Sequence, residues 1–343
     1  MDRRECRAFL DRWFTISFGN PEAGKRHAAE GLAHVEALGR PPDLYARALA
    51  IAGSSCRQRG ELEKAEAAYR RALEIYETLG FENHEHALDA ADLWRRIAYL
   101  RMEQRRYDEA LAAANHAALA FAAARSWDRY GRAVLTMGTI QLTKGDQSAI
   151  TTLSKSLRFL DANTSWEFHF SAVYNLAFAL SRVGEPTAET LETALSLLTG
   201  ARLSVRSRFR NPSARYTGGF RRKTPPDALL RFLQGRILAL LGQHPEAREL
   251  LESAREDLIE LEMPLEAAMV SIELAECYLW LAGPRRWQKI EQLCREVLGL
   301  LAPVPGASEA MTAYQLLQRA VAAQSAQAVR RQLVNAREKL GQR

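Results

Sequence analysis

The sequence has little glycine and little proline, and it lacks long stretches in which polar and apolar residues alternate. Its 343 residues include 20 glycines and 12 prolines, the residues that most often interrupt helices. A half-buried strand shows strict polar–apolar alternation. The shortage of helix breakers and the missing alternation argue against a β-rich fold and predict an all-α chain.

Long apolar runs are missing too. No window of about 18 uninterrupted apolar residues occurs, so we expect no transmembrane helix. The opening stretch, MDRRECRAFLDRWF, carries charges where a signal peptide has its apolar region. Hydrophobic residues make up 47% of the chain and charged residues 26%, as in a soluble folded protein. We therefore expect a cytoplasmic protein with no membrane partner.

The sequence also lacks the signatures of catalysis and metal binding. Its four cysteines, Cys6, Cys56, Cys277 and Cys294, have no metal-ligand spacing, which favours reduced thiols in a cytosolic protein. No Walker A loop, GxSxG elbow, HExxH helix or CxxC pair occurs. The His84–His86 cluster has no obvious third ligand, and a solvated helix start is favoured over a zinc site. We expect no enzyme activity, no catalytic residue, no metal and no cofactor.

What the sequence does contain is a repeat of 34 residues. The stretch 46–79 is ARALAIAGSSCRQRGELEKAEAAYRRALEIYETL. Small residues fall at repeat positions 8 (Gly53), 20 (Ala65) and 27 (Ala72), and an aromatic residue falls at position 24 (Tyr69). Small residues allow two antiparallel helices to approach closely, while larger residues fill the space between them. The stretch therefore predicts a helix–turn–helix unit.

Related units recur along the chain. A small residue at position 8 is found at Gly53, Ala98, Gly138, Ala177, Gly235 and Ala275, and glycine at position 15 is found at Gly60, Gly145, Gly184 and Gly242. The first unit contains two helices separated at Gly19-Asn20-Pro21, with Asn20 as N-cap. The predicted units span approximately 3–39, 44–79, 88–123, 130–160, 166–201, 227–261, 265–301 and 306–340.

This pattern resembles the tetratricopeptide repeat (TPR), for which a tryptophan at position 4, such as Trp94, is a specific mark. The resemblance implies a right-handed α-α superhelical solenoid of about seven to eight helix–turn–helix repeats, covering 1–343 as a single domain. The stretched repeats are similar to the TPR arrays of bacterial regulatory and signalling proteins. Those arrays include the peptide-sensing regulators of quorum systems.

In this repeat type the first helix of each unit lines the concave wall, with positions 2, 5, 9 and 12 pointing inward and position 6 close by. We expect the arginines there to be exposed and to bind carboxylates. Aromatic residues there, and Leu229 and Phe232 with them, either bind apolar side chains or pack between helices. Asn175 is a candidate for binding a peptide backbone. The predicted partner-binding groove comprises Arg47, Arg57, Arg95, Tyr99, Arg132, Tyr174, Asn175, Phe178 and Arg236.

One interval in the repeat series is too long. Position 8 advances by 58 residues between Ala177 and Gly235, and the interval contains a segment, 202–226, with eight Arg or Lys and no acid. Without these eight residues the chain has 39 basic and 41 acidic residues, a net charge of −2. We expect a basic insertion between repeats that is at least partly a loop. Its candidate binding residues are Arg206, Arg208, Arg210, Arg215, Arg221, Arg222 and Lys223.

Three functions fit these patterns. The leading hypothesis is a non-enzymatic adaptor or regulator that binds a protein or a peptide in the concave TPR groove and controls a partner protein. A second is a peptide-pheromone sensor of the quorum-sensing type that acts on a protein. A third is a nucleic-acid-binding accessory protein, because arginines interleaved with aromatic residues in 202–226 suit single-stranded nucleic acid. The same segment also suits an acidic protein or a solvated loop.

Overall fold

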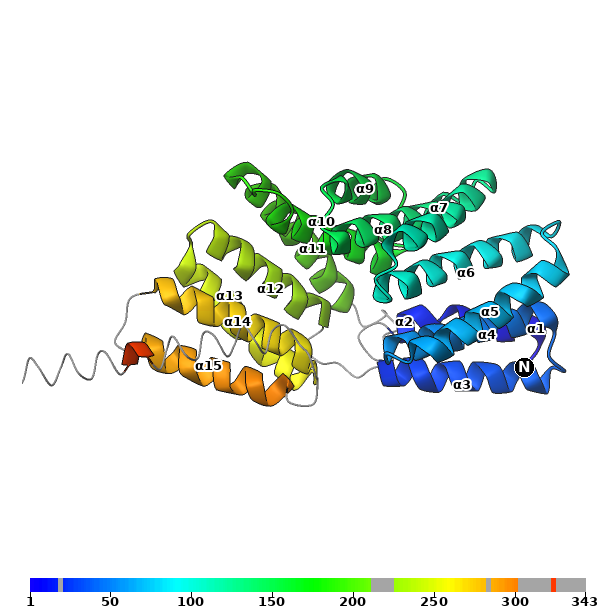
Figure 1. Cartoon of the computed structure of the whole chain (residues 1–343), viewed down its shortest axis with the longest axis horizontal. Helices are drawn as coiled ribbons and strands as arrows, with labels where there is room; N and C mark the ends of the chain where they lie inside the picture. The colour runs from blue at the N-terminus through cyan, green and yellow to red at the C-terminus, as the bar shows by residue number, and fades with distance from the viewer. Residues whose placement is uncertain (18–20, 211–224, 282–284, 302–321, 325–343) are drawn as a thin grey trace, which may run out of the picture. The chain divides into compact units, whose positions relative to one another are not determined.

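The computed structural model describes residues 1–17, 21–210, 225–281, 285–301 and 322–324, and the labelled helices of this part run from α1 to α15. These residues contain no strand (Figure 1). The chain divides into two compact units, unit 1 (Met1–Pro186) and unit 2 (Thr187–Arg343). The all-α expectation is confirmed, whereas a single array over 1–343 stays a prediction.

Unit 1 begins with three helices where the sequence predicts two. α3 begins at Pro21 as expected, but the stretch before it is divided at Arg12 into α1 and α2. The other helices of unit 1 form the expected pairs, except that the second member of the pair predicted over 166–201 belongs to unit 2. The bounds are α1 (Arg3–Asp11), α2 (Trp13–Ser17), α3 (Pro21–Ala37), α4 (Pro42–Gln58), α5 (Leu62–Leu79), α6 (His84–Glu103), α7 (Tyr107–Ala123), α8 (Trp127–Lys144), α9 (Ser148–Leu157) and α10 (Trp166–Arg182).

Position 8 of the repeat lies where two helices come closest. A Cβ atom added to Gly53 would lie 2.6 Å from a ring carbon of Tyr69, and one added to Gly138 would lie 2.7 Å from Leu153. The alanines at the same position, Ala98 and Ala177, are fully buried. Larger side chains do not fit at these contacts, so the small-residue pattern follows directly from the packing.

Position 15 ends the first helix of a pair and requires a left-handed backbone. Gly60, Gly145, Gly184 and Gly242 all have φ between 75° and 79°, a conformation that glycine adopts without a steric penalty. In the pair α6–α7 the same position is occupied by Arg105, whose φ is 61°. Arg105 therefore holds a strained backbone that the sequence pattern does not reveal.

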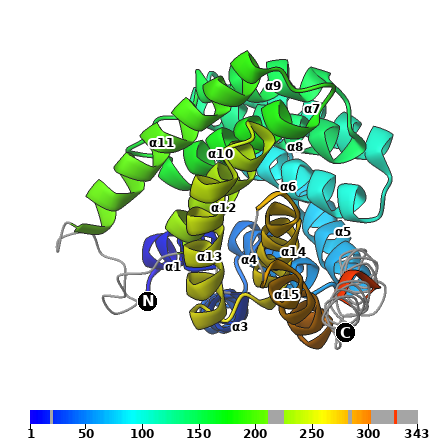
Figure 2. The same ribbon diagram turned by 90° about the vertical axis from the view of Figure 1, so that its left-hand side faces the viewer.

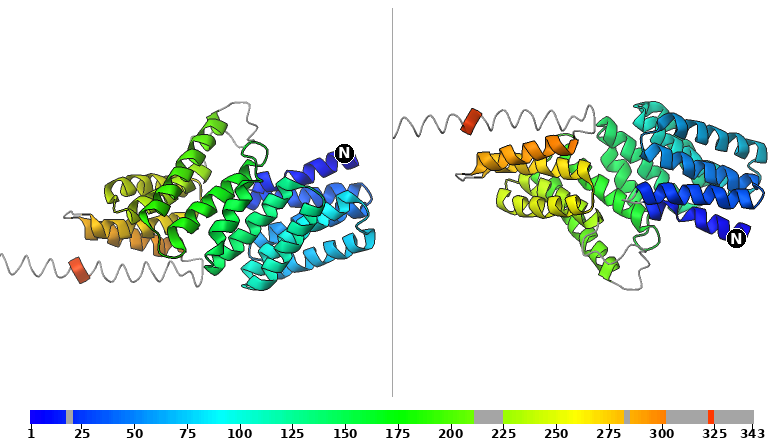
Figure 3. Two further views of the ribbon diagram at one scale, coloured as in Figure 1. Left: turned by 90° about the horizontal axis from the view of Figure 1, so that it is seen from above. Right: turned by 90° about the horizontal axis from the view of Figure 1, so that it is seen from below.

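The helices of unit 1 form two layers. One layer consists of α4, α6, α8 and α10, which pack side by side in this order. The other layer consists of α5, α7 and α9 (Figure 2). α1 packs against α3 and α4, on the face of α4 that points away from α5 (Figure 2, Figure 3). We call the layer of α4, α6, α8 and α10 the inner layer, and its face toward α1 the inner face.

Unit 2 contains α11 (Ala188–Arg210), α12 (Pro225–Leu240), α13 (His244–Glu260), α14 (Pro264–Trp280) and α15 (Arg286–Leu301). α12 pairs with α13 and α14 with α15 around one apolar core that includes Phe232, Leu251 and Leu274. Of the eighth predicted repeat, only 322–324 is described.

The basic segment 202–226 is partly helical, and its assignment as an insertion between repeats stays a prediction. α11 continues to Arg210, so Arg206, Arg208 and Arg210 belong to a regular helix. The remaining candidates, Arg215, Arg221, Arg222 and Lys223, lie outside the described residues. Arg202 forms an ion pair with Asp227 at 3.1 Å. Nucleic-acid binding through this segment stays a prediction. Among the helices described, none is both long and apolar enough to cross a membrane.

Candidate functional site

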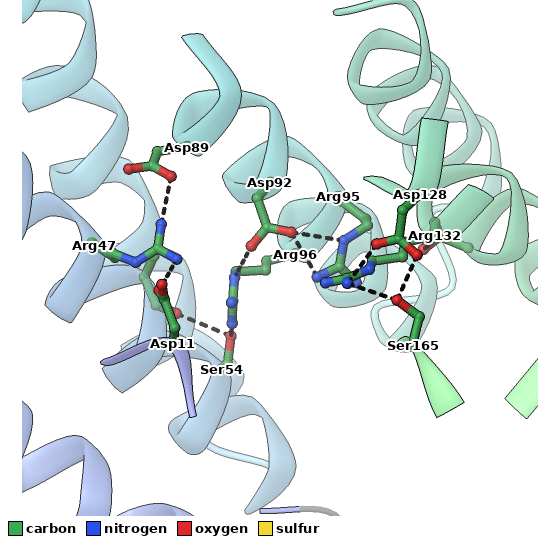
Figure 4. A network of polar contacts seen from close by, with 12 residues as sticks. Asp11, Arg47, Ser54, Asp89, Asp92, Arg95, Arg96, Asp128, Arg132 and Ser165 are labelled. Carbon is green, nitrogen blue, oxygen red and sulfur yellow. Dashed lines mark hydrogen bonds and ion pairs between the residues drawn. The ribbon is translucent and has the colours of Figure 1, made fainter. Parts of the chain in front are cut away.

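A chain of arginine–carboxylate contacts runs along the inner face of unit 1 (Figure 4). Its centre is α6, which supplies Asp89, Asp92, Arg95 and Arg96. Spacings of three and four residues place these side chains on one side of a helix. Neighbouring helices on both sides of α6 supply their partners, so the network connects elements that are distant in sequence.

The first part of the network surrounds Asp89, whose side chain is only 1% exposed. Arg7 and Arg47 donate to its carboxylate at 2.9 Å and 2.5 Å, and Arg47 also pairs with Asp11. Burial alone would lower the pKa of Arg47, but Asp89 and Asp11 raise that pKa above its ordinary value. Two guanidinium groups supply the compensation that a buried carboxylate needs.

The second part surrounds Asp92. Arg95 and Arg96 donate to its two carboxylate oxygens at 2.8 Å and 2.9 Å, and Arg96 also donates to the Ser54 hydroxyl at 2.8 Å. Burial would raise the pKa of Asp92, yet the two arginines hold that pKa well below its usual range. Arg95 itself is buried. The expectation of exposed arginines is therefore wrong for Arg95, because an internal carboxylate neutralises its charge.

The third part lies where α8 meets α10. Arg132 donates to the Ser165 hydroxyl at 3.0 Å and pairs with Asp128 at 2.6 Å. The guanidinium carbons of Arg132 and Arg95 lie 4.3 Å and 5.5 Å from the ring centre of Phe168, which is cation–π geometry.

Across the second and third parts, the arginines outnumber the aspartates that pair with them. Three guanidinium groups, those of Arg95, Arg96 and Arg132, share two carboxylates, Asp92 and Asp128. Burial, and next the repulsion from Arg95, lower the pKa of Arg132, and the attraction of Asp128 does not offset them fully. An additional anion near Arg132 would offset this repulsion.

Other predicted groove residues make contacts between neighbouring side chains. Arg57 pairs with Glu103 and lies 5.4 Å from the ring centre of Tyr99. Arg182 lies 5.5 Å from the ring centre of Phe178. Each of these pairs combines an aromatic face with a nearby guanidinium, as predicted for the groove. The guanidinium of Arg57 already has an internal carboxylate partner, Glu103.

Two predicted residues of α10 are half-buried and engaged with neighbours. The side-chain amide of Asn175 donates to the Thr139 hydroxyl on α8 at 3.0 Å. Tyr174 stacks on Phe170 with ring centres 6.2 Å apart. Asn175 thus links α10 to α8, and the proposed hydrogen bond to a peptide backbone has to share the amide with Thr139.

The remaining predicted residue, Arg236, belongs to unit 2 and pairs with Glu273. On the same helix, α12, Phe232 is buried in the apolar core and Leu229 packs against that core. Packing between helices, the alternative interpretation of these two apolar residues, is therefore correct. The other eight predicted groove residues all belong to unit 1, and their role in one binding site stays a prediction.

Sequence reasoning missed the contribution of α1 and α2. Arg7 and Asp11 join the network, the guanidinium carbon of Arg96 lies 5.6 Å from a Trp13 ring centre, and the Phe14 ring stacks on Phe168. No local pattern announces these contacts, because they join residues far apart in sequence. The pair Asp128–Arg132, by contrast, has the four-residue spacing that predicts a helical ion pair.

The His84–His86 cluster lies at the start of α6, as expected. Asn83 caps the helix by accepting from the backbone of Glu85 at 2.9 Å, and the Glu85 side chain approaches Arg7 at 3.5 Å. In the described ranges, no three His, Cys, Asp or Glu side chains gather as metal ligands would. The cysteines are free, and burial raises the pKa of the Cys277 thiol to about 11.

A scan against models of protein families finds no match, and a search of the curated proteins finds none either. Solved structures do match. One is a Signal Transduction ATPase with Numerous Domains (STAND) protein with a tetratricopeptide repeat sensor from Pyrococcus horikoshii. It is 13% identical, with 93% of this chain and 50% of that chain covered and a TM-score of 0.57. This chain thus spans half the length of the Pyrococcus protein.

Two further matches are Rap proteins. A Rap protein complexed with Competence and Sporulation Factor is 12% identical, with 94% and 99% of the two chains covered and a TM-score of 0.52. The Rap conjugation gene regulator of plasmid pLS20, in complex with the Phr* peptide, is 14% identical, with 94% and 95% covered and a TM-score of 0.52. The fold is that of tetratricopeptide-type repeat proteins. At these identities the likeness concerns the fold alone.

Proposed function

We propose that this TPR-type protein is a non-enzymatic adaptor or regulator that holds a peptide, or an extended or helical segment of a partner protein, against the inner face of unit 1. The observation that carries the proposal is the arginine cluster at Phe168, where Arg95 and Arg132 approach one ring and, together with Arg96, outnumber the two aspartates that pair with them. Buried ion pairs contribute little to stability compared with apolar packing. A row of charges that adds little to stability can instead serve to recognise a charged partner.

The contacts also indicate what the partner offers. Arg132 is partly exposed and presents a planar guanidinium, which suits a carboxylate. Tyr174 and Phe178 follow on α10 and are partly exposed, as suits an apolar or aromatic side chain of the partner. An acidic segment with a nearby aromatic residue satisfies both features.

The comparison with Rap proteins supports a peptide as one form of this partner. The Rap conjugation gene regulator of pLS20 is in complex with the Phr* peptide, and another Rap protein is complexed with Competence and Sporulation Factor. A helical array of this type therefore has room for a peptide. A more specific form of the proposed function is a sensor that binds a peptide and thereby controls a partner protein.

The test is a selection of peptides from a random twelve-residue phage library on the purified full chain. Selected peptides are then measured by fluorescence polarisation on the wild type, on Arg132→Gln, and on the control Arg70→Gln. Arg70 is exposed on α5, in the other layer of unit 1. We expect Arg132→Gln to weaken binding about tenfold, since a charge-assisted hydrogen bond contributes about 1.5 to 3 kcal/mol.

Arg132 is preferred to Arg95 for this test. Arg95 is buried beside Asp92, so a glutamate there would place two carboxylates together and unfold the region. If no peptide is selected, or if every selected peptide binds Arg132→Gln and the wild type equally, the proposed function is wrong.

A further inference from the structure

The inner face of unit 1 already holds one segment of the chain itself. At the end of α1, the carboxylate of Asp11 pairs with Arg47. Three residues later, the ring of Phe14 stacks on Phe168 with centres 4.4 Å apart and planes 8° apart. The Phe168 ring is the one that Arg95 and Arg132 approach. A carboxylate and an aromatic ring from α1–α2 therefore meet the positively charged, aromatic part of the inner face.

Different residues anchor this segment in the fold. Cys6, Leu10 and Trp13 are buried in a core shared with α3 and α4. Asp11 and Phe14 keep partly exposed side chains; Phe14 packs against the edge of that core, and Asp11 is not part of it. The three buried side chains supply the main anchor of α1–α2, and Asp11 and Phe14 add contacts at its partly exposed edge.

The internal contacts leave part of the binding capacity of the inner face unused. In the described part of the chain, the buried Nε atoms of Arg47 and Arg132 have no hydrogen-bond partner. A carboxylate that approaches an arginine from the side uses Nε together with one terminal nitrogen. Both Nε atoms are buried, so an external carboxylate reaches them only after the side chains that cover them have moved.

We propose that Asp11 and Phe14 act as an internal ligand, which a partner segment displaces by presenting a carboxylate and, three residues later, a phenylalanine. This inference rests on the proposed function and names the partner's chemistry and the regulation of the same site. If the internal ligand occupies the site in some of the molecules, only the remaining molecules can bind a partner. The apparent affinity is then the intrinsic affinity multiplied by the fraction of molecules with an open site. Weakening the internal contact therefore strengthens binding of an external segment.

The probe is a fluorescein-labelled alanine-based helical peptide with one aspartate and one phenylalanine three residues apart. Its affinity is measured on the wild type, on Phe14→Ala and on the control Phe81→Ala, whose side chain is 52% exposed. We expect Phe14→Ala to bind the probe about fivefold more tightly than the wild type. This gain corresponds to a rise in the fraction of molecules with an open site from a minority to a majority. Phe81→Ala should equal the wild type, and a probe with alanine in place of phenylalanine should bind none of the three.

A second readout needs no ligand. Amide hydrogen exchange from His169 through the second turn of α10, directly after Phe168, should be faster in Phe14→Ala than in Phe81→Ala, because the stacked contact is lost. Unchanged exchange, or a probe affinity for Phe14→Ala that is equal to or below that of the wild type, overturns the inference. If peptides selected from the library still depend on Arg132, the proposed function survives that result. If none is selected while exchange in Phe14→Ala rises, the proposed function fails and the internal contact alone is supported.

Discussion

Asp92 offers the sharpest test of the charge network, because one carboxylate serves two arginines. We consider Asp92→Asn, which keeps the shape of the side chain and removes its charge. Arg95, whose side chain is 7% exposed, would lose its ionic partner, while Arg96 would keep its hydrogen bond to Ser54. The substitution should therefore destabilise unit 1 mainly through the uncompensated charge of Arg95.

The expected loss follows from the burial of the pair. Removing one partner of a fully buried ion pair costs about 3 to 5 kcal/mol. Asp92 is 24% exposed and the neutral amide still accepts a hydrogen bond, so we expect a loss of about 2 kcal/mol. The matched control is Asp108→Asn, because Asp108 is 91% exposed and pairs with Lys144 on the surface at 3.1 Å. Exposed pairs contribute little, so this control should resemble the wild type.

Native-state hydrogen exchange is the suitable assay, because a chain with two compact units need not unfold in one step. The protection of α6 amides reports the opening free energy of the helix that carries Asp92. Equal protection of α6 in Asp92→Asn and Asp108→Asn would refute the reasoning, since it would mean that Arg95 needs no internal carboxylate.

The stability that Asp92 contributes to unit 1 decreases in acid. The folded-state pKa of Asp92 lies well below its ordinary value, because Arg95 and Arg96 outweigh the effect of burial. A lowered folded-state pKa gives stability that is present above the unfolded-state pKa of about 3.9 and is lost as the pH falls below it. The difference in protection between wild type and Asp92→Asn should therefore be constant near neutral pH and shrink in acid.

Two further substitutions test the repeat geometry. Arg105→Gly should raise the opening free energy of its helix pair, measured by the same hydrogen exchange, by about 1 kcal/mol, because it relieves a left-handed backbone with φ of 61°; an unchanged or lower value would mean that the turn is not strained. Gly53→Ala should lower the free energy by about 1 to 3 kcal/mol, because its Cβ would lie 2.6 Å from Tyr69. Its control, Gly200→Ala, meets no atom within 4 Å of the new Cβ in α11 and should show no such loss.

The repeat pattern was predictable because it depends on contacts within one helix pair. Gly53 and Tyr69 are 16 residues apart, and the small residue at one position explains the aromatic residue at the other. The glycine at position 15 is equally local, because it ends a helix. Arg105 shows the limit of such patterns, since the backbone conformation persists where the glycine is absent.

The chemistry of the inner face was predictable only in part. The repeat numbering correctly placed Arg95 and Arg132 on first helices, but it could not reveal their partners. Phe14 and Phe168 come from α2 and α10, which are far apart in sequence, so no single repeat encodes their contact. Arg95 is buried, although arginine on the wall of an open groove would be exposed, because Asp92 and Phe168 contact it within the fold.

The most direct test of the central claim is to locate a bound peptide on the chain. We choose a library-selected peptide whose binding depends on Arg132. It is synthesised with a photoreactive phenylalanine analogue in place of its aromatic residue. After crosslinking, the attachment sites on the chain are mapped by mass spectrometry. We expect crosslinks on α8 and α10, near Arg132 and Phe168, and more of them in Phe14→Ala than in the wild type. Crosslinks confined to α5, α7 or α9, on the other layer of unit 1, would contradict the account.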